Sequence, residues 1–72
     1  MNLDRFIQIV SEIIKIKKEE INEESNIYDD LGMDDLELLK IKVALENELM
    51  TSYPDDVFDE AVNIGDMYRI IL

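Results

Sequence analysis

The stretch that decides the fold is DDLGMDDLELLKIKVALENEL, residues 29–49. Gly32 permits a turn, and Asp34 is followed three residues later by Glu37. This spacing is that of a capping box, in which each side chain accepts a hydrogen bond from the backbone N–H of the other residue. We therefore predict a helix that begins after Asp34 and continues to about Leu49 or Met50.

The apolar residues of this predicted helix form two stripes rather than one. The first stripe contains Leu36, Leu39, Val43 and Met50, and the second contains Leu38, Ile41, Leu45 and Leu49. A helix that is apolar on two sides packs on both sides, or faces a partner or ligand with one of them. We expect it to be the central element of the fold.

A second amphipathic helix and a long loop precede this element. At 100° per residue, the apolar residues of the first segment fall within an arc of about 120°, which predicts a core helix over residues 3–17 with Asn2 as its cap.

Residues 19–33 lose this helical period of apolar residues, so we predict a long loop there. Its apolar anchors would be Ile21, Ile27, Tyr28 and Leu31. Loops of this length are uncommon in compact domains. One reason for this length would be a loop that runs back along the whole first helix, so that the second helix starts at the far end of the first.

The C-terminal third predicts two more helices. Pro54 breaks the helical pattern, and Asp55 can cap a short helix of one or two turns through residues 56–61. Asn63 with Asp66 repeats the capping signature before a final helix. No alternation typical of strands occurs. The sequence thus predicts an all-α fold, a small four-helix bundle in a single domain over residues 1–72, with three longer helices and one short one.

Composition excludes several classes of function. The chain has no cysteine and no histidine, which removes disulfides, thiol chemistry and the commonest general base, so we do not expect an enzyme. Its 18 acids and 7 bases give a net charge of −11. This charge disfavours nucleic acid and anionic membranes and favours partners with basic surfaces. No leader pattern or membrane-length apolar run is present, so we expect a soluble, cytoplasmic monomer.

The many acids raise the question of a metal site. An EF-hand loop that starts at Asn26 would place Glu37 correctly at position 12, but Tyr28 and Leu31 occupy positions that require an oxygen ligand and a glycine. We therefore predict no dedicated metal site.

The neighbouring carboxylates Asp34 and Asp35 do not predict catalysis either. Adjacent residues at the start of a helix point in different directions, and nothing predicts the burial that would raise the pKa of one of them. A cap followed by an acid that the helix dipole favours is the simpler interpretation. Residues 19–39 carry nine acids and no base, so acids surround the start of this helix.

The segment NIYDDLGMDDLELLKIKVALENEL, residues 26–49, resembles the acyl carrier protein family. Members of that family show a D-x-L-G-x-D-S-L segment, followed by an amphipathic helix that ends in A-L-E and further acids. The matching residues here are Asp29, Asp30, Leu31, Gly32, Asp34, Leu36, Ala44, Leu45, Glu46 and Glu48. The segment NIGDMYRII, residues 63–71, is similar to the last helix of the family.

This resemblance implies a four-helix bundle that carries acyl chains as thioesters on a phosphopantetheine arm. The arm is esterified to a serine at the start of the second helix, where a helix N-terminus stabilises the phosphate. The resemblance implies a docking surface for basic patches on carrier-dependent enzymes, formed by Asp34, Glu37, Glu46 and Glu48. It also implies an acyl pocket lined by Leu39, Val43, Leu45, Phe58, Ala61 and Ile64, for all of which core packing is the simpler interpretation.

The sequence departs from the family at the position that matches the attachment serine, which is Asp35. A carboxylate cannot form the phosphodiester, so the chain as written would carry no 4′-phosphopantetheine unless Asp35 were replaced by serine. The other hydroxyl residues do not match this position; they are Ser11, Ser25, Thr51 and Ser52. Lys40 and Lys42 also depart from the family, and we expect them to reduce the negative charge of a docking face.

We therefore predict an acyl carrier protein-like shuttle for fatty-acid or polyketide-type synthesis that cannot be loaded in this form. Asp35 could be a substitution that holds a real carrier unmodified, or a native feature of a carrier-like paralogue. The alternative functions are a non-carrying adaptor or regulator that docks to enzymes of acyl metabolism, and an unrelated small acidic protein such as an inhibitor or nucleic-acid mimic.

Overall fold

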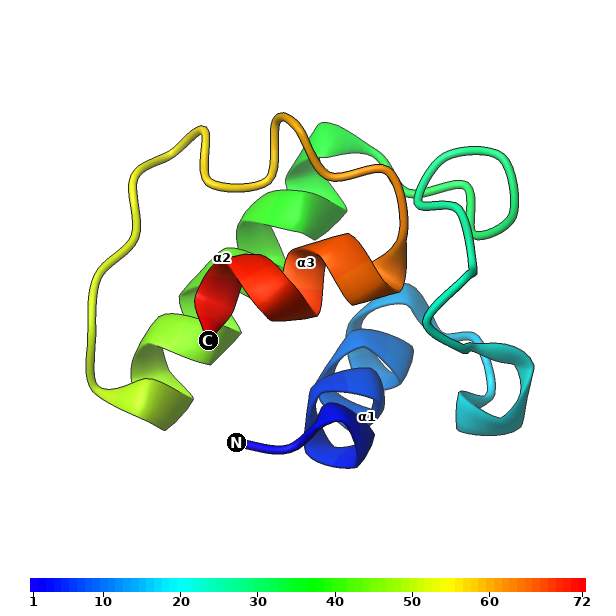
Figure 1. Cartoon of the computed structure of the whole chain (residues 1–72), viewed down its shortest axis with the longest axis horizontal. Coiled ribbons are helices and arrows are strands. Elements are labelled where there is room, and N and C mark those ends of the chain that lie inside the picture. Colours follow the sequence, from blue (N-terminus) through cyan, green and yellow to red (C-terminus); the bar gives the residue numbers. More distant parts are fainter.

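The computed structural model describes all residues from 1 to 72 and contains helices but no named strand (Figure 1). Helix α1 covers Leu3–Ile14, α2 covers Asp35–Leu49 and α3 covers Ile64–Ile71. A single 3-10 turn, η1, covers Lys18–Glu20 in the long loop between α1 and α2. The prediction of a small all-α fold is confirmed. No helix is of the length and apolarity needed to cross a membrane.

Helix α1 begins where the sequence predicts and ends three residues early. The Asn2 side chain accepts a hydrogen bond of 2.8 Å from the backbone N–H of Arg5. At the other end, Lys15 adopts the left-handed conformation with φ +61°, and its N–H donates to the carbonyl of Ser11 at 2.8 Å. This cap ends the helix before residues 16 and 17, although Ile16 still packs against the core.

The helices α1 and α2 are antiparallel, so the suggestion of a loop that runs the length of α1 is wrong. Arg5, near the start of α1, pairs with Glu48 near the end of α2, and Ile13 lies beside Leu39 and Val43. The loop instead reaches across to the start of α3, as the cyan and orange segments of Figure 1 show.

Backbone hydrogen bonds fix this loop against the start of α3. The N–H of Ile27 donates to the carbonyl of Val62 at 2.9 Å, and the N–H of Gly65 donates to the carbonyl of Glu23 at 2.9 Å. A Cβ at Gly65 would lie 3.2 Å from that carbonyl oxygen, so glycine permits the close approach. The predicted anchors at Ile21, Ile27 and Leu31 are buried, and Met33 joins them.

Tyr28 is the loop anchor that was predicted wrongly, because its side chain is 51% exposed. The turn it occupies is held by polar groups instead. The side-chain oxygen of Asn26 accepts hydrogen bonds from the backbone N–H groups of Tyr28 and Asp29 at 2.9 and 2.8 Å. Such an Asx turn fixes the backbone without any need to bury the side chain that follows.

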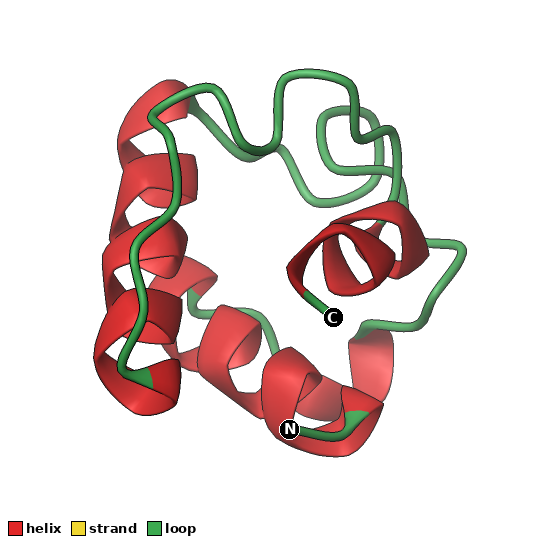
Figure 2. Ribbon diagram, turned by 60° about the vertical axis from the view of Figure 1, so that its left-hand side comes forward, coloured by secondary structure: helices red, strands yellow, loops and turns green.

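The predicted short helix over residues 56–61 is a series of turns. Each turn has a hydrogen bond to a carbonyl three residues earlier: from Val57 to Pro54, from Asp59 to Asp56, and from Ala61 to Phe58. Figure 2 shows this segment as irregular chain between α2 and α3. Phe58 and Ala61 of this segment are buried, and Val57 is partly buried against the same core.

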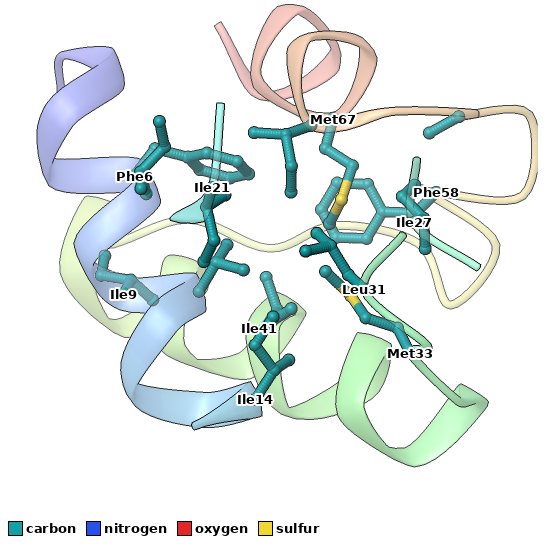
Figure 3. Packing of buried hydrophobic residues seen from close by; sticks show 14 of the residues in the cluster. Phe6, Ile9, Ile14, Ile21, Ile27, Leu31, Met33, Ile41, Phe58 and Met67 are labelled. Carbon is teal, nitrogen blue, oxygen red and sulfur yellow. The ribbon is translucent and has the colours of Figure 1, made fainter. Parts of the chain in front are cut away.

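Side chains from all three helices and both long connections form one core. Figure 3 shows Phe6 and Ile14 of α1, Ile41 of α2 and Met67 of α3 converging with Ile21, Ile27 and Phe58 from the connections. The ring of Phe6 also lies 5.7 Å from the ring of Tyr68. This shared core fixes the position of α2, whose start carries the candidate site.

Candidate functional site

The start of α2 is built as the sequence predicts. Gly32 turns the chain with φ +60°, and Met33 is buried next to it. The backbone N–H of Glu37 donates to Oδ1 of Asp34 at 2.8 Å, and the N–H of Asp34 donates to Oε1 of Glu37 at 3.2 Å. Both halves of the capping box are therefore present, and the first residue of the helix is Asp35.

Asp35 is exposed and has no ion-pair partner. Asp34 already caps the helix, so the fold does not require a second acid at position 35. Because the unpaired N–H groups of a helix start carry positive partial charge, a carboxylate there is favoured by the dipole alone. The group is accessible to a partner from solvent.

A small pocket of about 190 Å³ opens beside Asp35. It lies between α2 and the turns that follow Pro54. Its apolar lining residues are Leu38, Leu39, Val57 and Phe58, and its charged ones are Asp35, Lys42, Asp55 and Asp59. Three carboxylates and one ammonium group thus share a pocket with apolar walls.

The ammonium group in this pocket belongs to Lys42, which is only 8% exposed. Its Nζ lies 3.1 Å from Oε2 of Glu46 and 3.6 Å from Oδ1 of Asp55. A buried charge needs such partners, because burial without them costs several kcal/mol. Lys42 therefore pairs from a buried position with Glu46, one of the acids expected on the docking surface, and of the two departing lysines only Lys40 is on the surface.

The four acids expected to form a docking surface all have partners within the chain. Asp34 and Glu37 form the capping box. Glu46 accepts a hydrogen bond of 2.8 Å from the backbone N–H of Tyr53 and pairs with Lys42; these contacts hold the pKa of Glu46 below its ordinary value. Each of these acids therefore stabilises the fold, whatever else it contacts.

Glu48 differs from the other three acids because both of its carboxylate oxygens accept hydrogen bonds from one arginine. Arg5 donates from Nε to one carboxylate oxygen of Glu48 and from Nη2 to the other, both at 2.9 Å. These hydrogen bonds lower the pKa of Glu48 and raise that of Arg5. The pair joins the start of α1 to the end of α2, and sequence spacing gave no signal for it because the two residues are far apart in the chain.

The six residues expected to form a pocket or core divide into two groups. Leu45, Phe58, Ala61 and Ile64 are buried in the core. Leu39 and Val43 are 46% and 45% exposed, so their assignment to core packing is wrong. Of the six, Leu39 and Phe58 line the pocket beside Asp35.

No hydroxyl group lies at the start of α2. Ser11 is in α1 and donates to the carbonyl of Gln8, and buried Ser25 accepts from the backbone N–H of Asn22. Thr51 and Ser52 follow the opposite end of α2. A group that is attached through a phosphate ester needs a hydroxyl oxygen, so the residues at this helix start do not fit covalent attachment. The structure also holds no group of three or more acidic side chains that could bind a metal ion.

Comparisons with known proteins agree with the fold. The pattern of the family described as "Phosphopantetheine attachment site" matches residues 4–71. An acyl carrier protein of Wolinella succinogenes is 32% identical over 68 residues, which cover 94% of this chain and 90% of the relative. An acyl carrier protein of Clostridium perfringens gives the same identity and coverage.

These matches extend over almost the whole chain and agree with its helical fold. The prosthetic group of the matched family is 4′-phosphopantetheine. Acyl carrier proteins are carriers and not enzymes, so the prediction that the chain is not an enzyme is confirmed. The chain belongs to the acyl carrier protein family.

Proposed function

We propose that this chain is a carrier-type protein of fatty-acid or polyketide-type synthesis that is not loaded with phosphopantetheine in the form of this sequence. The observation that carries the proposal is Asp35: an exposed carboxylate at the first residue of α2, with no hydroxyl in the same turn. The neighbouring features of an attachment position are retained, namely the turn at Gly32, the cap at Asp34 and the small pocket.

In this proposal, Asp35 contributes negative charge to the start of α2 and forms no covalent bond to a prosthetic group. A phosphate ester at a helix start would be an anion stabilised by the backbone N–H groups, and a carboxylate is also an anion. Asp35 therefore keeps negative charge at this position without an attached group. A partner with a basic patch would still be attracted to the start of α2.

Restoring a hydroxyl tests this proposal. We expect that Asp35→Ser, incubated with a phosphopantetheinyl transferase and coenzyme A, gains the mass of one phosphopantetheine group. Asp34→Ser is the matched control, because it places a hydroxyl one residue earlier and serine still caps the helix. We expect no mass gain for that control or for the unaltered chain.

Intact-protein mass spectrometry would measure all three proteins. If Asp35→Ser stays unmodified with several transferases while its circular dichroism is unchanged, position 35 is not an attachment position and the proposal fails.

A second candidate function is a non-carrying adaptor that docks to enzymes of acyl metabolism. It is favoured by the carboxylates that remain around α2, because Asp35, Asp55 and Asp59 line one pocket and Asp34 is exposed beside them. We propose carrier-dependent enzymes with basic patches as the partners, Asp34, Glu37, Glu46 and Glu48 as further docking residues, and a cytoplasmic monomer as the working form.

Binding of the unaltered chain to a carrier-dependent enzyme would test the adaptor function. Surface plasmon resonance should give an affinity that falls as salt rises and falls further with Asp35→Lys. Binding that is absent, or indifferent to Asp35→Lys, would exclude docking through this helix start.

A further inference from the structure

Lys42 is the only charged residue that is buried, and it lines the pocket beside Asp35. An ammonium group has three N–H donors. Only two carboxylates, those of Glu46 and Asp55, lie within ion-pair distance of its Nζ. At least one donor of Lys42 is therefore left for an oxygen atom of a molecule that enters the pocket.

The two carboxylates hold Lys42 unequally. Glu46 lies one turn later on α2, with Oε2 at 3.1 Å from Nζ, and it also accepts the hydrogen bond from the backbone N–H of Tyr53. The Oδ1 of Asp55 lies 3.6 Å from Nζ, beyond hydrogen-bond distance, and the Asp55 side chain is 98% exposed. An ion pair that is open to water contributes little to stability. An oxygen atom of a bound molecule can therefore replace Asp55 beside Nζ at small cost.

The rest of the pocket wall suits a short carbon chain. Leu38 and Leu39 of α2 face Val57 and Phe58 of the following turns across the pocket. An apolar cavity of about 150 Å³ is large enough for a benzene molecule. The volume of about 190 Å³ beside Asp35 thus has room for roughly six to eight carbon and oxygen atoms.

An unsubstituted hydrocarbon would match these walls but not the ammonium group. It would remove water from Lys42 and offer no hydrogen bond in return, and a buried polar group without a partner is unfavourable. A carbonyl or hydroxyl oxygen would supply the missing acceptor. A second carboxylate on the bound chain would be repelled by Asp35, Asp55 and Asp59, which also line the pocket.

We propose that Lys42 makes this pocket selective for a short acyl chain that bears an oxo or hydroxyl group, and that it does so by donating a hydrogen bond to that oxygen. The assignment of the occupant as an acyl chain rests on the proposed function. Its oxygen substituent is inferred from the pocket alone. The specificity-determining residue is then Lys42, and Glu46 positions it.

Chemical tethering tests this selectivity without any transferase. The chain has no cysteine, so Asp35→Cys provides a single thiol at the edge of the pocket. Alkyl methanethiosulfonates would attach matched chains to that thiol as mixed disulfides. One probe is an unsubstituted chain of about eight carbons, the size that the pocket accommodates. The others have the same length and one oxo group, placed at each successive carbon in turn.

Three measurements follow the tethered chains. Nuclear Overhauser contacts between the terminal methyl group and the ring of Phe58 would show that a chain lies inside the pocket. We expect at least one oxo chain to raise Tm by roughly 4–8 °C more than the hydrocarbon does, the shift expected for one hydrogen bond to a charged group in a domain of this size. The infrared stretch of its carbonyl should move to lower frequency, which a purely structural role of Lys42 would not cause.

Variants at position 42 would assign the effect. Lys42→Met should abolish both the difference in Tm and the infrared shift. If this variant is unfolded by circular dichroism, Lys42→Met combined with Glu46→Gln removes both charges and keeps an amide oxygen for the N–H of Tyr53. Lys40→Met is the matched control, because it makes the same change on α2 at an exposed residue outside the pocket. It should leave the difference between the probes unchanged.

A hydrocarbon chain that stabilises the domain as much as every oxo chain would overturn the proposal. A preference for the oxo chain that survives Lys42→Met would overturn it too, as would oxo chains that make no contact with Phe58. None of these results bears on the proposed function, because the tether uses neither a transferase nor a restored serine.

Discussion

The adjacent acids Asp34 and Asp35 should differ sharply in their contribution to stability. The Asp34 carboxylate accepts a hydrogen bond of 2.8 Å from the backbone N–H of Glu37. The backbone N–H of Asp34 in turn donates to the carboxylate of Glu37. Losing such a cap costs about 1–2 kcal/mol. Asp35→Ala loses a favourable dipole interaction of about 0.3–1 kcal/mol. It also gains about 0.5 kcal/mol in helix propensity, so its net effect should be close to zero.

Thermal unfolding followed by circular dichroism would measure this difference. For a domain of this size, 1 kcal/mol corresponds to about 4–8 °C, so Asp34→Ala should lower Tm by roughly 5–15 °C and Asp35→Ala by less than about 4 °C. Each substitution removes one of the 18 acids and changes the net charge from −11 to −10, so relief of repulsion is the same in both. If Asp35→Ala lowers Tm as much as Asp34→Ala does, Asp35 has a structural task and the reasoning about the site is refuted.

Three further predictions concern the packing and charge of the domain. Leu45→Ala should lower the free energy of unfolding by about 2–5 kcal/mol, because the Leu45 side chain is fully buried. Leu39→Ala should lower it by less than about 1 kcal/mol, because Leu39 is half-exposed. Urea titrations would measure both, and equal losses would contradict the difference in burial between the two leucines. The hydrogen bonds from Arg5 lower the pKa of Glu48 in the folded state. The stabilisation that Glu48 gives the folded state is therefore present above the pKa of Glu48 in the unfolded chain and is lost as the pH falls through its pKa in the folded state. The stability difference between the unaltered chain and Glu48→Gln should therefore close on acidification, and a difference that stays constant would argue against the pair. Raising ionic strength from about 0.01 to 0.15 M shortens the Debye length from about 30 to 8 Å and should raise Tm, which a scan at the two salt concentrations would test.

Local signals in the sequence predicted much of the fold. The capping boxes at Asp34 and Asn63 are both present, because the hydrogen bonds that define them join residues three apart. The two apolar stripes of α2 were also predicted, and one of them does face solvent. Which stripe would be exposed depends on where α1 and α3 pack, and for this reason Leu39 and Val43 were assigned wrongly.

The features that were missed depend on contacts between distant residues or on weak local preferences. The turns at residues 56–61 follow Asp55, the cap that the sequence predicted. Only Phe58 and Ala61 are buried there, with Val57 partly buried, so packing does not enforce a regular helix. The pairing of Arg5 with Glu48 spans most of the chain and has no sequence signal.

The burial of Lys42 did have a signal. At 100° per residue Lys42 lies about 40° from Leu38, at the edge of the stripe that the core covers. Glu46, one turn later, is the partner that such a buried cation needs. Helical position would have distinguished Lys42 from surface Lys40.

The most direct test of the central claim is the intact mass of this protein as isolated from the cells that make it. If Asp35 leaves the chain without an attachment point, the mass will equal that of the polypeptide alone, within the ordinary processing of its ends. A species heavier by one phosphopantetheine group, mapped by fragmentation to any residue of α2, would contradict the account.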